Sequence, residues 1–351
     1  MEKIEAEFIE VLSNLLKIPA PAGYEQEIRK VIIDYVAQAG FEYEVDPAGN
    51  LLVKISGKNN DGPLTVMAAH MDEIGMVVTD IEPDGKLRVI NSGGLAAVKT
   101  GERPVEIISD KGTNIVGIFS MGSAHRQDAR EGKWALGWND VRIITGLSPE
   151  QLKKKGIRVG SPAVPVESDR GPHIFGDESD PMIAAWTFDD RGGVAMLLQA
   201  LKQLKETSFK PENPLIIAFT VHEEGGCHGA KVLADRLHPW RFIAVDGCPV
   251  LEQSQTLDGR PGCWSKDMLT NYDRELLGLF SDAAEDVNTD LQYMVYSSAA
   301  SDASAVYNAG NADRVGFIGH VRTNSHGFET ARLSVFSNAL ALIVKFIEKN
   351  C

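Results

Sequence analysis

The sequence predicts an α/β protein whose mixed, mostly parallel central sheet is flanked by helices and interrupted by a small β-barrel-like insert. Short apolar runs that end in polar residues are typical of parallel strands buried on both faces. They alternate with stretches of helical periodicity. Between residues 74 and 168 the pattern changes to short strand-like runs separated by glycine-containing turns. We therefore expect one α/β domain built from residues 1–73 and 169–351, with residues 74–168 inserted into it.

The individual elements follow from periodicity and from turn residues. Residues 46–49 (DPAG) predict the turn of a hairpin over residues 41–55. Buried strands are expected at residues 64–69, 214–219 and 241–245, and further strands at residues 183–188, 291–296 and 315–318. Helices are expected at residues 4–18, 24–39, 194–205, 230–237, 275–283, 301–308 and 333–349.

The insert contains strand-like runs at residues 75–79, 86–90, 105–109, 115–120 and 141–145. Ser148-Pro149-Glu150 has the residue types that begin a helix. Residues 124–137 are polar and irregular, so we expect an exposed loop in which His125 has no assigned function.

Composition restricts the partners. The 351 residues include 35 lysines and arginines against 49 acidic residues, for a formal charge of −14. Such a charge repels phosphate backbones and anionic lipids, so neither nucleic acid nor a membrane is an expected partner. The four cysteines have no metal-binding or disulfide spacing, which favours a reducing compartment. With a charged N-terminal stretch and no long apolar span, the sequence predicts a cytoplasmic protein.

Polar residues gather where the predicted strands end, the usual place for ligands in open α/β sheets. The segment 220–229 (TVHEEGGCHG) follows one such strand. Its adjacent Glu223 and Glu224 point to opposite sides in extended backbone, so one can bind a metal while the other handles a proton. Each of these residues alone would more often be a turn or cap residue. The other candidates are His70, Asp72, Asp189, Asp190, Asp246 and His326.

Together these residues supply two histidines and several carboxylates, the ligands of a pair of borderline divalent ions such as zinc, cobalt or manganese. Two ions roughly 3.5–4 Å apart require a bridging carboxylate. Such a pair polarises a carbonyl oxygen and lowers the pKa of a shared water to about 7. A carboxylate outside the ligand set, such as Glu223, can then accept the water's proton and deliver it to a leaving amine. This chemistry is amide hydrolysis.

Five motifs follow one another along the chain: AHMDEIG at 69–75, FDDRGG at 188–193, VHEEGGCHGA at 221–230, AVDG at 244–247 and SHGFE at 325–329. This ordered set resembles the glutamyl and tetrahedral aminopeptidases of metallopeptidase family forty-two. With PAPAGYE at 19–25 and DPAGNL at 46–51, the resemblance covers nearly the whole chain. It implies a zinc-peptidase-like fold, a small peptide substrate that loses its N-terminal residue, and a homo-oligomer. In that assembly the insert makes dimers, and the dimers form a dodecamer.

The resemblance also implies a role for each residue. Asp189 would bridge two divalent ions, most naturally zinc, with cobalt or manganese as alternatives. His70 and Asp246 would complete one site, and Glu224 and His326 the other. Glu223 would be the general base, and Asp72 would orient the imidazole of His70. A non-proline cis peptide is implied between Asp189 and Asp190.

Departures from the family pattern leave several points open. Glu329 follows His326 by three places where the family has four, so His320 is an alternative ligand. His222 and His228 are expected to be structural or to line the pocket, where they would alter specificity. A deacylase for an unusual amide and a metal-stabilised scaffold without turnover remain as alternatives. A glycoside hydrolase is disfavoured, because its two carboxylates must flank a sugar whereas Glu223 and Glu224 are neighbours.

Overall fold

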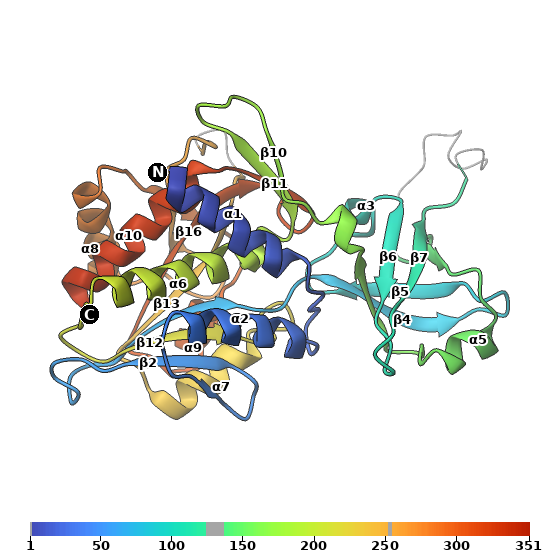
Figure 1. Ribbon diagram of the computed structural model, residues 1–351, viewed down its shortest axis with the longest axis horizontal. Helices are drawn as coiled ribbons and strands as arrows, with labels where there is room; N and C mark the ends of the chain where they lie inside the picture. The colour runs from blue at the N-terminus through green and yellow to red at the C-terminus, as the bar shows by residue number, and fades with distance from the viewer. Residues whose placement is uncertain (1, 124–136, 252–254) are drawn as a thin grey trace.

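A computed structural model describes residues 2–123, 137–251 and 255–351. The protein consists of an α/β body and a β-barrel that projects from one side of it (Figure 1). The predicted fold class is therefore confirmed. Residues 124–136, which include His125 and all but the last residue of the expected loop at 124–137, lie outside the described residues.

The sheet of the body is parallel at its centre and antiparallel toward its edges. The parallel strands, in spatial order, are β12 (Leu215–Thr220), β3 (Thr65–His70), β13 (Arg241–Pro249) and β16 (Arg314–Thr323). Almost every residue of these four strands is buried, which explains their continuous apolar runs. The remaining strands are β1 (Glu44–Val45), β2 (Leu51–Ile55), β10 (His173–Phe175), β11 (Met182–Trp186), β14 (Gly262–Lys266), β15 (Gln292–Val295) and β17 (Phe328–Arg332).

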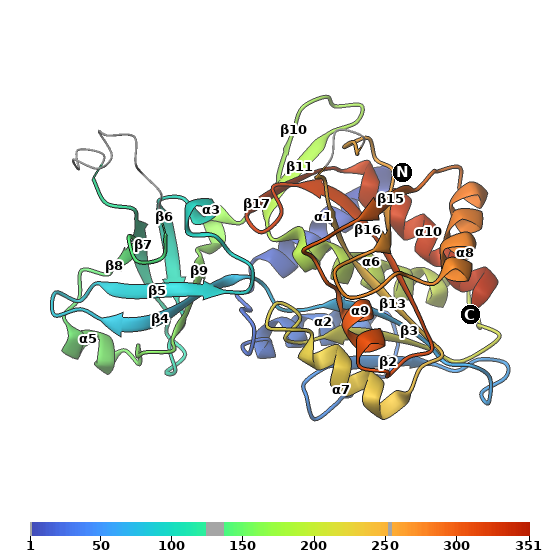
Figure 2. The same ribbon diagram turned by 180° about the vertical axis from the view of Figure 1, so that it is seen from behind.

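Helices cover both faces of this sheet. One face carries α1 (Glu2–Leu16), α2 (Gln26–Gln38), α6 (Phe188–Glu206) and α10 (Ser334–Asn350), with α8 (Arg274–Asp286) packed against α10 (Figure 1). On the opposite face α7 (His228–Leu237) packs against α9 (Asp302–Asn308), as Figure 2 shows. No helix in the described part of the chain has the length and apolar character needed to cross a membrane.

Six antiparallel strands form the closed barrel and enclose a core of their own. Along β7 (Ile115–Ser120) buried and exposed side chains alternate, as expected for a strand with one face toward a core. The short helix α5 (Pro149–Lys154) begins where the sequence predicts, with the Ser148 hydroxyl accepting from the Gln151 N–H. The other elements are β4 (Gly75–Ile81), β5 (Leu87–Ser92), α3 (Ala97–Thr100), β6 (Arg103–Ile107), β8 (Arg142–Ile144), β9 (Pro162–Pro165) and the 3₁₀-helix Glu167–Asp169.

A buried ion cluster joins the barrel to the body. Glu73, two residues before the first barrel strand begins, accepts hydrogen bonds from Nη1 of Arg170 at 3.0 and 3.1 Å and from the Trp186 indole at 3.2 Å. Nη2 of Arg191 lies 3.6 Å from the same carboxylate. The Ala20 N–H also donates to it at 2.8 Å. Because Arg170 follows the last barrel strand, this cluster holds the two ends of the barrel segment together.

Candidate metal centre

The predicted site residues converge at one edge of the central sheet. His70 is the last residue of β3, Glu223 and Glu224 follow β12, and Asp246 lies in β13. Because these strands are parallel, their carboxyl ends meet at the same edge. Asp189 comes from the first turn of α6, where φ −76° and ψ 101° are non-helical. The implied cis peptide bond between Asp189 and Asp190 is present.

One group of potential metal ligands consists of His70, Asp189 and Asp246. Nε2 of His70 lies 3.0 Å from Oδ1 of Asp189 and 4.0 Å from Oδ2 of Asp246. One ligating atom from each of the three residues lies within 4.8 Å of the others. One imidazole with two carboxylates is a suitable donor set for a borderline divalent ion.

Asp189, Glu224 and His326 form a second group, also with ligating atoms within 4.8 Å. Nε2 of His326 lies 3.6 Å from Oδ2 of Asp189 and 3.7 Å from Oε1 of Glu224. The two groups thus share Asp189, which faces each histidine with a different oxygen. Oε1 of Glu224 is buried without a hydrogen-bond partner. Since a buried carboxylate oxygen requires a partner, the residues of this group fit a bound cation.

Glu223 belongs to neither of these two groups. Its Oε2 lies 3.9 Å from Nε2 of His70, and its Oε1 accepts a hydrogen bond from the Cys227 thiol at 3.4 Å. The carboxylate therefore stands beside the first ligand group, with one oxygen turned toward it.

Asp72 positions three of the predicted residues at once. Its Oδ1 accepts the backbone N–H of Glu223 at 2.9 Å, and its Oδ2 accepts that of Glu224 at 3.0 Å. Oδ1 also lies 3.5 Å from Nδ1 of His70, and that nitrogen is 3.1 Å from the Asp72 carbonyl oxygen. The side chain is fully buried. Asp72 therefore couples the orientation of the imidazole to the path of the Glu223–Glu224 backbone.

The predicted hairpin supports the same loop from the other side. Asn50, which follows the hairpin turn, accepts the Val221 N–H at 3.1 Å and donates to the Gly229 carbonyl at 2.9 Å. Its amide also donates to Asp46, which in turn accepts the N–H groups of Gly49 and Asn50. The segment that carries the two glutamates is thus held at both of its ends.

The charges of the site are strongly coupled. Burial alone would raise the pKa of Asp189, but Arg322, His326 and His70 hold it well below the usual range. Burial and neighbouring carboxylates raise the pKa of Glu223 and Asp246 well above their ordinary values and that of Glu224 to about 7. Burial alone would lower the pKa of His326, but Asp189 and Glu224 raise it to about 9. Protons and divalent cations therefore compete for the same groups.

A cavity of about 460 Å³ opens onto both ligand groups and onto Glu223. Its walls include Trp264, Tyr296 and Leu251 as well as the polar site residues. This volume is in the range of small-molecule sites, and the apolar wall is suited to a side chain. The cavity therefore places an apolar wall beside the potential metal ligands.

Comparison with known proteins identifies the family. The model of a family described as M42 glutamyl aminopeptidase matches residues 49–342. This chain belongs to that family. Membership of this family supports the assignment of the chain as a peptide hydrolase. The glutamyl aminopeptidase of Lactococcus lactis is 27% identical over 284 residues, which cover 73% of this chain and 71% of that protein.

Solved structures of two aminopeptidase or peptidase chains share nearly the complete fold. An aminopeptidase of Desulfurococcus kamchatkensis is 26% identical with a TM-score of 0.88, covering 98% of this chain and 95% of that chain. The TET1 peptidase of Pyrococcus horikoshii is 28% identical with a TM-score of 0.84, and the match covers 97% of this chain and 99% of that chain. That peptidase assembles into a tetrahedron or a large octahedral shell.

Two residues of this M42 site were not predicted from the sequence. Arg322, within β16, is buried and forms a short salt bridge with Oδ2 of Asp189. Glu329 accepts the backbone N–H groups of Asp189 at 3.0 Å and His326 at 3.2 Å, and lies 3.1 Å from Nε of Arg322. The only sequence signal for Glu329 was its altered spacing from His326. The chain accommodates this spacing with a left-handed backbone at His326, where φ is 57°.

His320, His222 and His228 belong to neither of the two ligand groups found in the described part of the chain. His320 is buried among Phe188, Phe336 and Gly192, and neither ring nitrogen has a hydrogen-bond partner. Burial, with the charge of Arg322, lowers its pKa to about 3, so it is neutral. His222 donates its backbone N–H to Glu25 at 3.2 Å, and His228 begins α7. His222 and His228 are absent from the wall of the 460 Å³ cavity among the described residues.

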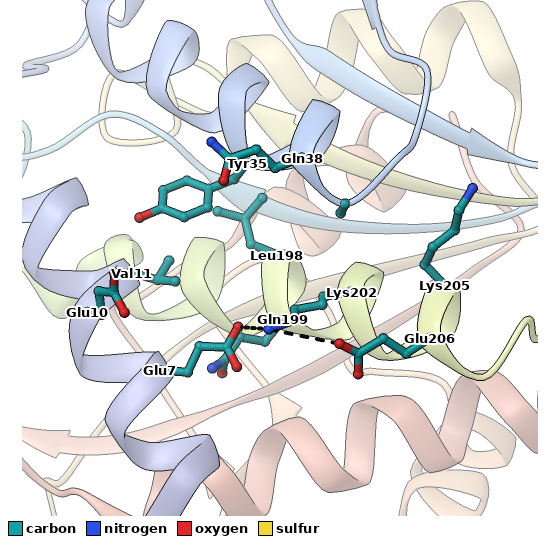
Figure 3. A pocket seen from close by; sticks show the side chains of 11 residues that line it. Glu7, Glu10, Val11, Tyr35, Gln38, Leu198, Gln199, Lys202, Lys205 and Glu206 are labelled. Atoms are coloured by element: carbon teal, nitrogen blue, oxygen red, sulfur yellow. Dashed lines mark hydrogen bonds and ion pairs between the residues drawn. The ribbon is translucent and has the colours of Figure 1, made fainter.

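A second hollow of about 450 Å³ lies between α1, α2 and α6 (Figure 3). Three of its charged side chains pair with one another, since Lys202 contacts Glu7 and lies 3.9 Å from Glu206. No histidine or cysteine is among its described lining residues. This hollow therefore lacks the imidazole ligands that the sheet-edge site combines with its carboxylates.

Proposed function

We propose that this protein is a two-metal aminopeptidase that removes N-terminal residues from short peptides. The observation that carries the proposal is the shared position of Asp189 between two histidine-and-carboxylate groups. A carboxylate with one oxygen toward each group has the arrangement of a bridging ligand. The alternatives that we weigh against it are a deacylase for an unusual amide and a metal-stabilised scaffold.

His70, Asp189 and Asp246 would hold one divalent ion, and Asp189, Glu224 and His326 the other. Zinc is the ion best suited to these donors, with cobalt and manganese as alternatives. When bound, the ions would polarise the scissile carbonyl and lower the pKa of the attacking water. Glu223, with Oε2 turned toward His70, accepts the water's proton and delivers it to the leaving amine. Asp72 holds His70 and Glu223 in fixed positions relative to each other during this transfer.

Self-association through the barrel is part of the proposal. Four large apolar side chains are exposed on β5, β8 and β7, which are neighbours in the barrel. They are Ile90, Ile144, Val116 and Ile118. An exposed apolar patch on adjacent strands favours burial against a second copy. We propose that residues 74–168 form the dimerisation domain and that dimers join into a dodecamer. Solution mass measured for wild type and Ile118→Asp tests this, since loss of the apolar surface should release smaller species.

We further propose that the protein works in the cytoplasm. All four cysteines are free, which agrees with a reducing compartment.

The function is tested by a hydrolysis screen of aminoacyl and N-blocked substrates. The chelated protein is assayed first, and again after addition of zinc, cobalt or manganese. We expect hydrolysis only after a metal is added and only of substrates with a free α-amine. Hydrolysis confined to N-blocked amides would favour the deacylase, and no hydrolysis with any metal would favour the scaffold.

A further inference from the structure

A third group of ligating atoms lies immediately beside the proposed base. It consists of a carboxylate oxygen of Glu223, the sulfur of Cys227 and a carboxylate oxygen of Asp302, all within 4.8 Å of one another. Glu223 connects this group to the first metal site, because its Oε2 faces His70 while its Oε1 faces the Cys227 thiol.

Two segments far apart in sequence bring these side chains together, because Glu223 and Cys227 lie in one loop and Asp302 lies on α9. Glu223 follows β12, Cys227 directly precedes α7, and Asp302 is the first residue of α9. Cys227 adopts a left-handed conformation with φ 56°, which reverses the chain before α7. Helices α7 and α9 pack together (Figure 2), and the first residue of α9, Asp302, has a carboxylate oxygen within 4.8 Å of the Cys227 sulfur. The group is therefore built by the fold and does not depend on a single flexible loop.

Asp302 provides the independent indication that this group receives a ligand. The residue is only 4% exposed, and its Oδ2 accepts the Thr220 hydroxyl at 2.6 Å. Its Oδ1 is buried without a hydrogen-bond partner. Buried carboxylate oxygens are almost always paired, because leaving one unpaired costs about 1–3 kcal/mol.

Compensating charge from the protein is scarce at this position. In the described ranges, neither Glu223 nor Asp302 forms a salt bridge with a lysine or arginine. Burial raises the pKa of Asp302 to about 6, and burial with the nearby carboxylates raises the pKa of the Cys227 thiol above its ordinary value. A bound cation would relieve the accumulation of buried acidic groups.

We propose that Glu223, Cys227 and Asp302 bind a third divalent ion of the thiophilic class, Zn²⁺ or Cd²⁺, and that this ion inhibits hydrolysis by occupying Glu223. The inference rests on the proposed function, because that function assigns proton transfer to Glu223. On binding, the S–H bond of Cys227 is replaced by a sulfur–metal bond and the proton passes to solvent, with no change of oxidation state. Glu223 and Cys227 line the 460 Å³ cavity, so an ion reaches them by the substrate's route.

The sulfur distinguishes this site from the other two. Both proposed catalytic groups offer only nitrogen and oxygen atoms. Thiolate favours zinc, cadmium and cobalt, whereas Mn²⁺ prefers oxygen ligands. Excess Zn²⁺ should therefore inhibit the enzyme, and excess Mn²⁺ should not.

The first experiment titrates the chelated protein with Co²⁺ and records the near-ultraviolet absorption that a cobalt–thiolate bond produces. We expect this absorption after two equivalents are bound, in wild type and in the control Cys351→Ser. It should be absent in both Cys227→Ser and Cys227→Ala. Two replacements are used so that misfolding of one does not decide the result. No such absorption in wild type, or its survival in a folded Cys227 variant, overturns the inference.

The second experiment measures inhibition by added Zn²⁺, with each variant normalised to its own activity at two bound ions. Wild type should lose activity in excess Zn²⁺, and Cys227→Ser should require at least about tenfold more, or ~1.4 kcal/mol of binding free energy. Equal sensitivity would overturn the inhibitory role. Hydrolysis without the thiolate absorption would refute the third site and leave the proposed function intact. The absorption without hydrolysis at any metal load would support the site and refute both the proposed function and the inhibitory role.

Discussion

Replacement of Asp72 by asparagine tests whether one buried carboxylate organises the metal centre. The wild-type side chain accepts one backbone N–H on each oxygen, from Glu223 and Glu224, and lies 3.5 Å from Nδ1 of His70. Asparagine has one acceptor oxygen, so in either orientation its NH₂ group faces one of the two N–H donors. The loss of one charge-assisted hydrogen bond should lower the free energy of unfolding by about 1.5–3 kcal/mol.

The metal centre should be affected as well, because partners of metal-binding histidines typically contribute about 10–100-fold to metal affinity or activity. We expect Asp72→Asn to bind zinc about 10–100-fold more weakly in competition with a chromophoric chelator, with a matching loss of kcat/KM at limiting metal. The matched control is Asp267→Asn. Asp267 is also fully buried and accepts the N–H groups of Leu269 and Thr270, but it lies outside both proposed catalytic ligand groups. Similar metal affinity in the two variants would refute the reasoning, even if both were destabilised.

Three further predictions concern single residues. Glu223→Gln should keep two bound ions and lower kcat about 10²–10⁴-fold; a kcat within a few-fold of wild type would exclude Glu223 as the base. Asp189→Ala should lose both ions together in elemental analysis, and retention of two ions per chain would exclude the bridging role. His320 has a folded pKa of about 3 against an ordinary value of 6.5. As the pH falls, His320 therefore gains its proton in the unfolded chain before it does so in the folded chain. The stability that comes from neutral His320 is complete above pH 6.5 and is lost as the pH falls toward 3. Metal-free His320→Leu should lack this loss, which amounts to as much as ~5 kcal/mol at pH 3; equal acid-unfolding profiles would contradict it.

The sequence was most informative where a feature depends on one local segment. A buried strand followed by polar residues predicts both the strand and the edge at which its side chains meet, which is why His70, Glu224 and Asp246 were recognised. Arg322 was not recognised, because it continues the apolar strand β16 and its partner Asp189 is 133 positions away. The pairing of Cys227 with Asp302 depends on how α7 packs against α9, which no local pattern encodes. The sheet was predicted as mostly parallel; its four central strands are parallel, and antiparallel strands extend both edges.

The buried ion cluster around Glu73 has a consequence for the metal centre. Only two residues separate Glu73 from His70, and one of them is Asp72. A shift of the barrel relative to the body would therefore act, through Arg170 and Glu73, on the same short segment that carries Asp72 and His70.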